Sequence, residues 1–155
     1  MSRKTARAAA MQLIFERVSG GQGGEETLNM VYEELRETGA PDGVPVAEGE
    51  PNQDDRAYIA EAFDGVLTHR EELDRLIEQT ARGWSLERMS LVDLTILRLA
   101  VWEMLYAPKV PDSVAIAEAL ELTERYSDPD DKSFINGVLG SIQRKKEAET
   151  AEAKS

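Results

Sequence analysis

The chain has 155 residues, with 18 basic and 30 acidic side chains for a net charge of −12, and it contains no cysteine. That length suffices for one domain with a sizeable core, and the lack of cysteine excludes disulfides and thiolate metal sites. The acidic balance argues against indiscriminate nucleic-acid binding, because the mean field repels phosphate. The first residues are basic and then apolar, but Gln12, Glu16 and Arg17 interrupt them, so we expect a cytoplasmic protein without a signal peptide.

A basic cluster opens the first predicted helix, which we expect from about Arg3 to Val18. Arg3, Lys4 and Arg7 are three or four residues apart, so a helix places them on one side of its first two turns. Cations at a helix N-terminus oppose the macrodipole, which indicates that these charges serve to bind an anion. A local basic patch can bind RNA when the acidic surface lies elsewhere. A solvated basic end that binds nothing explains the pattern equally well.

Three more helices are expected before the centre of the chain, from apolar residues at helical spacing. A long loop rich in proline and glycine separates the first of them from the second, whose cap is Asn52 or Asp54. The pattern breaks near Thr68 and His69, where the second helix gives way to the third. The predicted ranges are 25–37, 54–68 and 69 to about 83.

The most apolar stretch, from Ser90 to Tyr106, predicts a central buried helix. Its few polar residues scatter around the helix axis, and a helix that is apolar nearly all round lies inside a domain. Ser90 and Asp93 resemble a capping box at its start. The stretch is too short and too charged to span a membrane. We expect its core residues to include Leu94, Leu97, Val101 and Leu105.

Two helices complete the predicted fold. One is capped by Asp112 or Ser113 and runs to about Tyr126, and the last covers 133–142. From Arg144 onward the tail is charged and rich in alanine, so we expect it to fray into solvent. No stretch alternates as a strand would, and the sequence predicts an all-α fold of about seven helices. The first of these two helices should face inward through Ile116, Ala119, Leu120 and Thr123.

Residues that carry chemistry in enzymes are sparse. The only histidine, His69, has polar neighbours in the sequence, where a histidine is usually a plain surface residue. The chain has no phosphate-binding glycine loop, no nucleophile paired with a base and no zinc-ligand spacing. We therefore expect a binding protein rather than an enzyme, with no cofactor and no metal.

Several segments in a fixed order carry a family likeness. They are the opening SRKTARAAAMQLIF, the stretch DDRAYIAEAFDGV, the patterns Trp84 to Arg88 and Asp93 to Glu103, and the ending VPDSVAIAEALEL with KSFINGVLGSI. Each segment alone is a weak signal, but their order and spacing together are specific. Over nearly its full length the chain resembles the NusB family of bacterial transcription antitermination factors.

The resemblance implies a single RNA-binding domain at 1–146, in two helical lobes at about 1–82 and 84–146, and a flexible charged tail at 147–155. It also implies a partner, the small ribosomal protein NusE, with which the family binds the single-stranded boxA element of nascent RNA. The pair then joins the RNA polymerase antitermination complex in ribosomal RNA operons. A basic first helix would hold phosphates, and acidic surface elsewhere would suit a basic ribosomal partner.

The resemblance also implies an RNA surface with two kinds of contact. Cations of the first helix would touch the RNA backbone, and aromatic rings would stack on unpaired bases. Phe15 stands where the family has a tyrosine, and a core role explains both Phe15 and Phe134 about as well. The implied RNA-binding residues are Arg3, Lys4, Arg7, Phe15, Asp130, Lys132 and Phe134.

The implied partner contacts lie near the start of the central helix, at Glu87, Arg88 and Asp93. A simple helix cap explains Asp93 equally well. Two departures from the family, Ala117 for a common asparagine and Ser133 for a common lysine, bear on RNA affinity or partner details.

Two other functions stay open. A NusB-like domain also forms the N-terminal part of certain ribosomal RNA cytosine methyltransferases, although those need a Rossmann-type catalytic domain and a reactive cysteine that this sequence lacks. The other is a homo-oligomeric helical protein, such as a homodimer, with weak RNA binding, which the low positive charge beyond the first helix favours.

Overall fold

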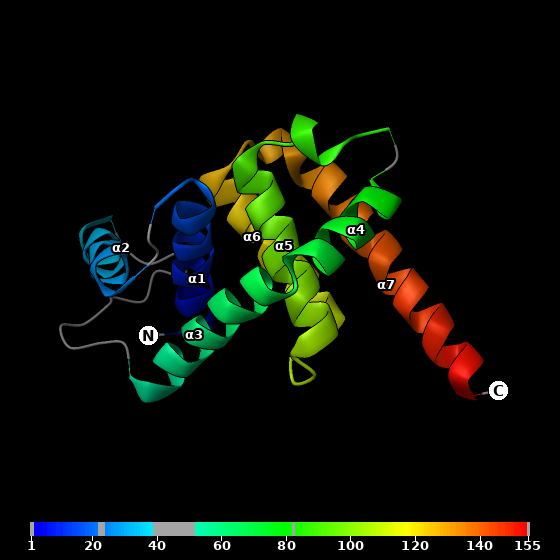
Figure 1. The fold of residues 1–155 in the computed structure, drawn as a ribbon, viewed down its shortest axis with the longest axis horizontal. Coiled ribbons are helices and arrows are strands. Elements are labelled where there is room, and N and C mark those ends of the chain that lie inside the picture. The colour runs from blue at the N-terminus through cyan, green and yellow to red at the C-terminus, as the bar shows by residue number, and fades with distance from the viewer. Residues whose placement is uncertain (1, 22–23, 39–51, 82, 155) are drawn as a thin grey trace. The chain divides into compact units, whose positions relative to one another are not determined.

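The computed structural model describes residues 2–21, 24–38, 52–81 and 83–154. These residues form seven α-helices and two short 3-10 helices, with no strand among them, which confirms the predicted all-α fold (Figure 1). The helices cluster into two units, Met1–Thr68 and His69–Ser155. The boundary therefore lies earlier than the predicted limit between lobes at 82–84. Most of the predicted long loop, 39–51, lies outside the described residues.

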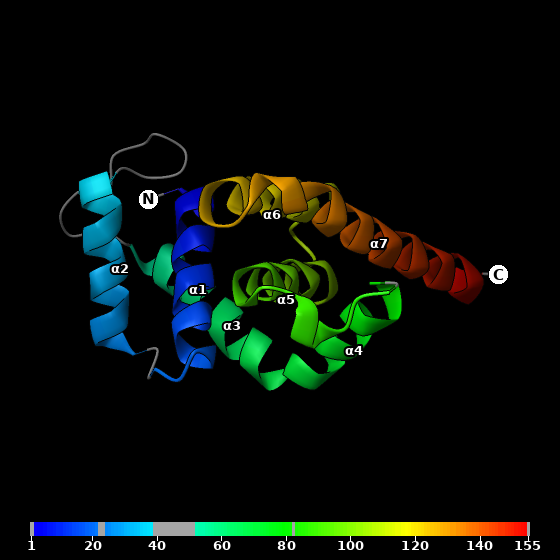
Figure 2. The same cartoon turned by 90° about the horizontal axis from the view of Figure 1, so that it is seen from above.

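The first unit contains α1 (Arg3–Val18), α2 (Glu25–Thr38) and α3 (Gln53–Thr68). Helix α1 packs against both α2 and α3, as Figure 2 shows from above. The structure buries nearly every side chain of α1 from Thr5 to Ile14. Four of the nine buried side chains are alanines, and small residues let neighbouring helices approach from several sides at once.

Two caps confirm the predicted starts of helices in this unit. Ser2 precedes α1, and its hydroxyl accepts a hydrogen bond from the backbone N–H of Thr5 at 3.1 Å. Asn52 precedes α3, and its Oδ1 accepts from the N–H of Asp55 at 2.9 Å while its own N–H donates to Asp55 Oδ2 at 3.2 Å. This reciprocal pair satisfies two donors at the helix end, so Asn52 is the cap rather than Asp54.

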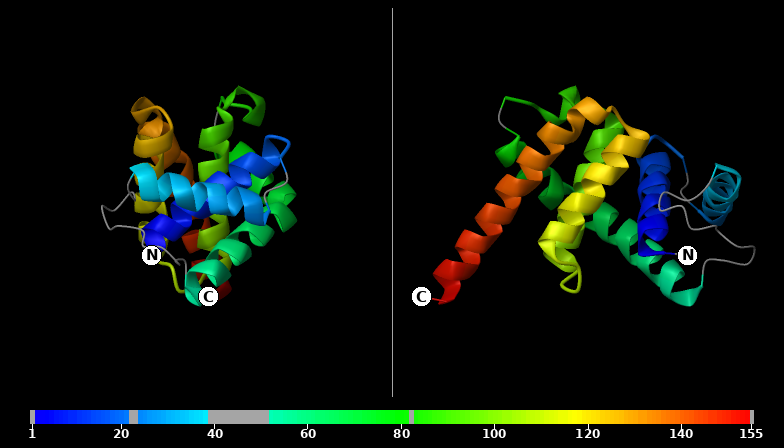
Figure 3. Two further views of the ribbon diagram at one scale, coloured as in Figure 1. Left: turned by 90° about the vertical axis from the view of Figure 1, so that its left-hand side faces the viewer. Right: turned by 180° about the vertical axis from the view of Figure 1, so that it is seen from behind.

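The second unit contains α4 (Arg70–Thr80), η1 (Leu86–Arg88), α5 (Leu91–Tyr106), α6 (Asp112–Tyr126), η2 (Pro129–Asp131) and α7 (Lys132–Lys154). Helix α5 packs against α4, α6 and α7, which Figure 3 shows from two further sides. The unbroken run from Asp93 to Met104 is buried, which confirms α5 as a central helix. Ser90 caps α5 by accepting from the N–H of Asp93 at 3.1 Å.

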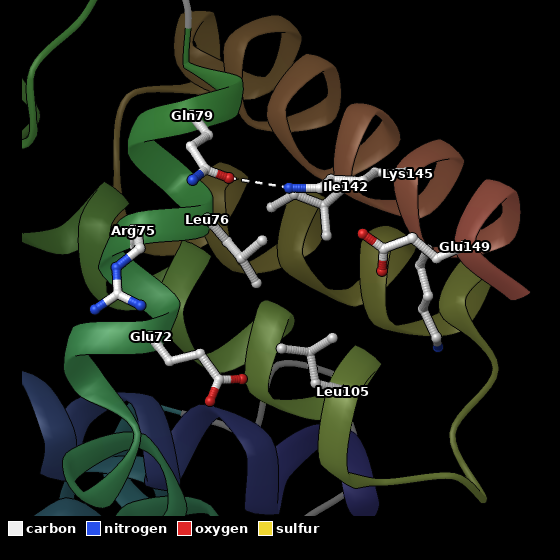
Figure 4. A pocket seen from close by; sticks show the side chains of 9 residues that line it. Glu72, Arg75, Leu76, Gln79, Leu105, Ile142, Lys145 and Glu149 are labelled. Carbon is white, nitrogen blue, oxygen red and sulfur yellow. Dashed lines mark hydrogen bonds between the residues drawn. The ribbon is translucent and has the colours of Figure 1, made fainter.

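Leucines of α5 are buried to different depths. Leu97 is fully buried and Leu94 nearly so, as predicted, but the expectation for Leu105 is wrong because this side chain is only half-buried. Leu105 lines an open hollow between α4, α5 and α7 with a volume of about 300 Å³ (Figure 4). Leu76 and Ile142 also line it, and Lys145 donates to Gln79 Oε1 at 3.0 Å at its edge. None of the predicted site residues lines this hollow.

Helix α6 starts where predicted but without a side-chain cap. Pro111 occupies the cap position, so neither Asp112 nor Ser113 plays the predicted role. Leu120 was expected to face inward but is half-buried. Ala115 and Leu122, which were not predicted to face inward, are buried.

Helix α7 corrects the prediction that the tail frays from Arg144, because the helix continues to Lys154. Lys146 Nζ donates to the backbone oxygen of Met104 at 2.6 Å and to Asp112 Oδ1 at 2.9 Å. It thereby satisfies one of the carbonyls left unpaired at the C-terminal end of α5. Alanine, glutamate and lysine in the tail also favour a helix intrinsically. The last turns of α7 project away from α5 and α6 (Figures 1 and 3).

Candidate nucleic-acid interface

The basic start of α1 presents its cations unequally. Arg3 is exposed and Lys4 is half-buried, whereas Arg7 is only 4 % exposed. The guanidinium carbon of Arg3 lies 4.3 Å from the ring centroid of Tyr58 on α3, and that of Arg7 lies 5.9 Å from the same centroid. Both distances suit a cation–π contact. One buried tyrosine therefore orders two of the three predicted cations.

This geometry corrects one expected contact. A phosphate cannot reach a side chain that the protein covers almost completely, so Arg7 does not offer the predicted direct contact in this structure. Arg3 and Lys4 remain accessible at the first turn. Sequence spacing identified the shared side of the helix, but it did not reveal that Tyr58 covers part of that side.

Phe15 lies near the other end of α1 and is half-buried. Its backbone oxygen accepts from the N–H of Ser19 at 3.0 Å and from the Ser19 hydroxyl at 2.7 Å, which closes the last turn of α1. The ring is neither a fully buried core residue nor a fully open platform. Its predicted role in stacking stays a prediction.

A second group of predicted RNA residues lies where η2 meets α7, in the other unit. Asp128 accepts from the N–H of Asp130 at 2.9 Å and so fixes the turn, which leaves Asp130 exposed. Lys132 forms an ion pair with Glu124 at 2.8 Å, with 43 % of its side chain exposed. Phe134 is half-buried, and its ring centroid lies 5.7 Å from that of Trp84 at an interplanar angle of 56°.

Of the three predicted partner residues, two are exposed and one is buried, much as the cations of α1 differ in exposure. Glu87 and Arg88 are exposed on η1, but Asp93 is only 5 % exposed at the start of α5. The Ser127 hydroxyl donates to Asp93 Oδ1 at 2.5 Å. Ser90 caps the helix, so Asp93 is neither the cap nor an open contact: its carboxylate joins α5 to the end of α6.

Asp131 on η2 also engages Asp93. A side-chain hydrogen bond with Asp93 raises the pKa of Asp131 from 3.8 to about 6, and partial desolvation and the charges of Asp93, Asp128 and Asp130 add to the shift. Two carboxyl groups that share one site cannot both ionise freely. Local sequence patterns do not indicate this contact, because its members lie on separate helices.

Trp84 is the most prominent aromatic residue that the predicted site did not include. It was noted only as part of a family pattern, yet its side chain is 52 % exposed while it contacts Phe134. An exposed tryptophan beside a candidate site residue can be recognised only once the structure brings 84 and 134 together.

The described ranges hold neither a candidate metal site nor a candidate membrane span. No group of three or more histidine, cysteine, aspartate or glutamate side chains there could hold a metal ion. No helix in that part of the chain is both long and apolar enough to cross a membrane.

Comparisons with known proteins agree with this architecture. The model of the NusB family matches residues 4–144. The transcription antitermination protein NusB of Symbiobacterium thermophilum is 40 % identical over 145 residues, covering 93 % of this chain and 90 % of that protein. The structure of NusB from T. maritima superposes with a TM-score of 0.73 at 27 % identity, covering 93 % and 92 % of the two chains.

A crystal structure of antitermination factors NusB and NusE in complex with double-stranded RNA is also similar. It matches with a TM-score of 0.71 at 26 % identity, over 92 % of this chain and 96 % of that one. Sequence similarity over nearly the whole length and a common fold lead to one conclusion. The chain belongs to the NusB family.

Proposed function

We propose that this protein is a transcription antitermination factor that binds boxA-type single-stranded RNA together with the ribosomal protein NusE. The observation that carries the proposal is the exposed basic first turn of α1 in a chain of the NusB family. A solved relative that holds NusB, NusE and RNA in one complex supports both partners. The role is one of binding in the cytoplasm, where nascent RNA and ribosomal proteins are found, and it requires no catalysis.

The RNA backbone is contacted first by Arg3 and Lys4. Both lie on the first turn of α1. The contact with Tyr58 already restricts the Arg3 side chain, so this side chain loses less conformational entropy on binding RNA. Arg7 acts as a positioning residue, because it packs over the same tyrosine from within the helix. Two phosphate contacts, rather than three, follow from this arrangement.

Bases are contacted by the half-buried rings of Phe15 and Phe134. A partly exposed ring, held by its buried part, can stack on an unpaired base without losing much side-chain entropy. Asp130 and Lys132 precede Phe134 in sequence by four and two residues and are available at the surface. A carboxylate there accepts from the amino groups of base edges, and a lysine donates to base acceptors such as guanine O6 and N7.

NusE is contacted through η1, where Glu87 and Arg88 are exposed. The net charge of −12 favours a basic partner, because complementary charge speeds association and suppresses wrong partners. Asp93 contributes indirectly. Its hydrogen bond with Ser127 holds the start of α5, the helix that directly follows η1.

The experiment is an RNA titration with and without NusE. Purified protein is titrated with boxA-type single-stranded RNA, with a scrambled RNA of the same composition, and with a double-stranded form. We expect weak binding by the protein alone, and tighter and more sequence-selective binding with NusE present. Equal affinities in both conditions would contradict the proposed joint assembly.

A further inference from the structure

Trp84 is a large aromatic side chain held firmly in place while half of it remains open to solvent. It follows Gly83, whose φ of +81° is a conformation that favours glycine. The backbone N–H of Trp84 donates to the oxygen of Ala81 at 3.0 Å, and η1 begins two residues later. The other tryptophan, Trp102, is only 6 % exposed and belongs to the core.

Phe134 supports Trp84 from the first turns of α7. The two ring centroids are 5.7 Å apart and the planes are tilted by 56°, a geometry within the favourable range for aromatic pairs. Phe134 is half-buried and lies in the first turn of α7. The pair therefore joins a segment before η1 to the start of α7 and leaves indole surface uncovered.

The charges around this pair are unsuitable for phosphate. Three carboxylates, Glu87, Asp128 and Asp130, are exposed in the adjoining segments and outnumber Arg88, the exposed cation of η1. Lys132 is already paired with Glu124 at 2.8 Å. A nucleotide that meets this surface gains from its base, because stacking needs no positive charge. Exposed carboxylates at the rim suit the amino groups of a base edge better than they suit a phosphodiester.

We propose that Trp84, supported by Phe134, forms a platform on which one unpaired RNA base stacks, and that this platform extends the RNA surface toward η1. The inference rests on the proposed RNA binding and adds a residue to it. The phosphates of the bound strand are held by Arg3 and Lys4 or lie away from the platform. The platform therefore contributes affinity that does not depend on salt.

The test is a double-mutant cycle between protein and RNA. Wild type and Trp84→Ala are each titrated, without NusE and then with it, with boxA-type single-stranded RNA and with a series of RNAs that each carry one abasic nucleotide. We expect Trp84→Ala to raise the Kd for intact RNA by roughly 5- to 150-fold, as removal of one base–aromatic stack of 1–3 kcal/mol predicts. At one abasic position the substitution should have almost no further effect, and the salt dependence should be unchanged throughout.

Fluorescence supplies an independent readout. Trp84→Phe retains a smaller ring for stacking and leaves Trp102 as the sole tryptophan, so its spectrum can be subtracted from that of wild type. We expect RNA to quench the Trp84 component and leave the Trp102 component unchanged. Tyr106→Ala removes another exposed aromatic residue of the same unit and should not change RNA affinity. Circular dichroism and thermal melts check that each variant is folded.

The outcomes separate this inference from the proposed function. If wild type binds RNA and Arg3→Ala/Lys4→Ala weakens it, while Trp84→Ala has wild-type affinity and RNA quenches no fluorescence, the platform is refuted and RNA binding stands. If Trp84→Ala lowers affinity only when NusE is present, Trp84 contacts the protein partner instead and the inference is overturned. If wild type binds none of the RNAs with or without NusE, the proposed function itself fails.

Discussion

Each unit has one helix that is buried nearly all round, and the two helices differ in the side chains they bury. Helix α5 buries large aliphatic residues, and its buried Arg98 forms two hydrogen bonds with Asp74 on α4, at 2.7 and 3.0 Å. Helix α1 buries four alanines among its nine buried residues, and its buried Arg7 lies over the ring of Tyr58.

This difference separates a structural helix from one that also presents a surface. The Arg98 guanidinium and Asp74 form a bidentate pair within the core of the second unit, where the charges serve to hold α4 against α5. In α1 the cations extend from the exposed Arg3 to the covered Arg7, both over one aromatic ring. The covered arginine packs within the unit, and the exposed first turn carries the proposed RNA contacts.

The largest expected effect comes from the core of α5. Leu97→Ala should lower the free energy of unfolding by about 2–5 kcal/mol, because Leu97 is fully buried and its removal opens a cavity. Chemical denaturation monitored by circular dichroism measures the loss. Leu105→Ala on the same helix is the matched control and should cost clearly less, since Leu105 lines the open hollow. Equal losses for both would mean that α5 is not the core of its unit.

Arg7→Ala should affect stability rather than RNA binding. We expect a loss of about 1–2 kcal/mol, the contribution of a desolvated cation–π contact. The slope of log K against log salt for RNA should match that of wild type, because Arg7 is too covered to release counterions. Denaturation and RNA titrations at several salt concentrations measure both quantities. A reduced slope with unchanged stability would restore Arg7 as a phosphate contact.

Arg3→Ala/Lys4→Ala should show the opposite behaviour. Two phosphate contacts on a single strand contribute about 1.4 to the salt slope, at about 0.7 per contact. The double variant should lose that amount, bind all RNA sequences more weakly to a similar degree, and keep nearly wild-type stability. Arg70→Ala, another exposed arginine in the second unit, is the control and should leave the slope unchanged. An undiminished slope in the double variant would place the RNA backbone elsewhere on the protein.

Local patterns in the sequence predicted much of this fold. The bounds of α1 and α5 follow from apolar spacing and, at the start of α5, from the predicted cap Ser90, which depends on neighbours a few residues away. The order of family motifs then placed the candidate site on α1, η1 and the start of α7. These features depend on short-range geometry or on similarity along the chain.

The parts that were missed depend on contacts between distant segments. Nothing near Arg7 in sequence shows that Tyr58 covers it, and nothing near Asp93 shows that Ser127 and Asp131 bind it. Helix α7 also continues beyond its predicted limit, and there Lys146 contacts the end of α5, a distant segment of the chain. Charged residues were read as surface residues, and tertiary contacts decided which of them are covered.

The smallest expected effect on stability concerns Asp93 on α5 and Asp131 on η2, which share a hydrogen bond. Their contribution depends on pH, whereas the cation–π contacts of α1 do not titrate in this range. The hydrogen bond with Asp93 raises the pKa of Asp131 to about 6 in the folded protein, against 3.8 ordinarily. The folded state therefore binds this proton more tightly than the unfolded state does. The stabilisation from this proton is fully present below about pH 3.8 and is lost as pH rises through about 6.

Asp131→Asn replaces the ionising carboxyl with an amide that can donate to Asp93 at any pH. We expect the variant to be more stable than wild type at pH 7, and the difference to shrink steadily as pH falls from about 6 toward 4. Other carboxyl groups titrate in both proteins, so the difference between their urea midpoints isolates Asp131. Asp130→Asn, an exposed neighbour, controls for the loss of one negative charge near the site. A difference between Asp131→Asn and wild type that stays constant from pH 4 to 7 would mean that Asp131 and Asp93 do not share a proton.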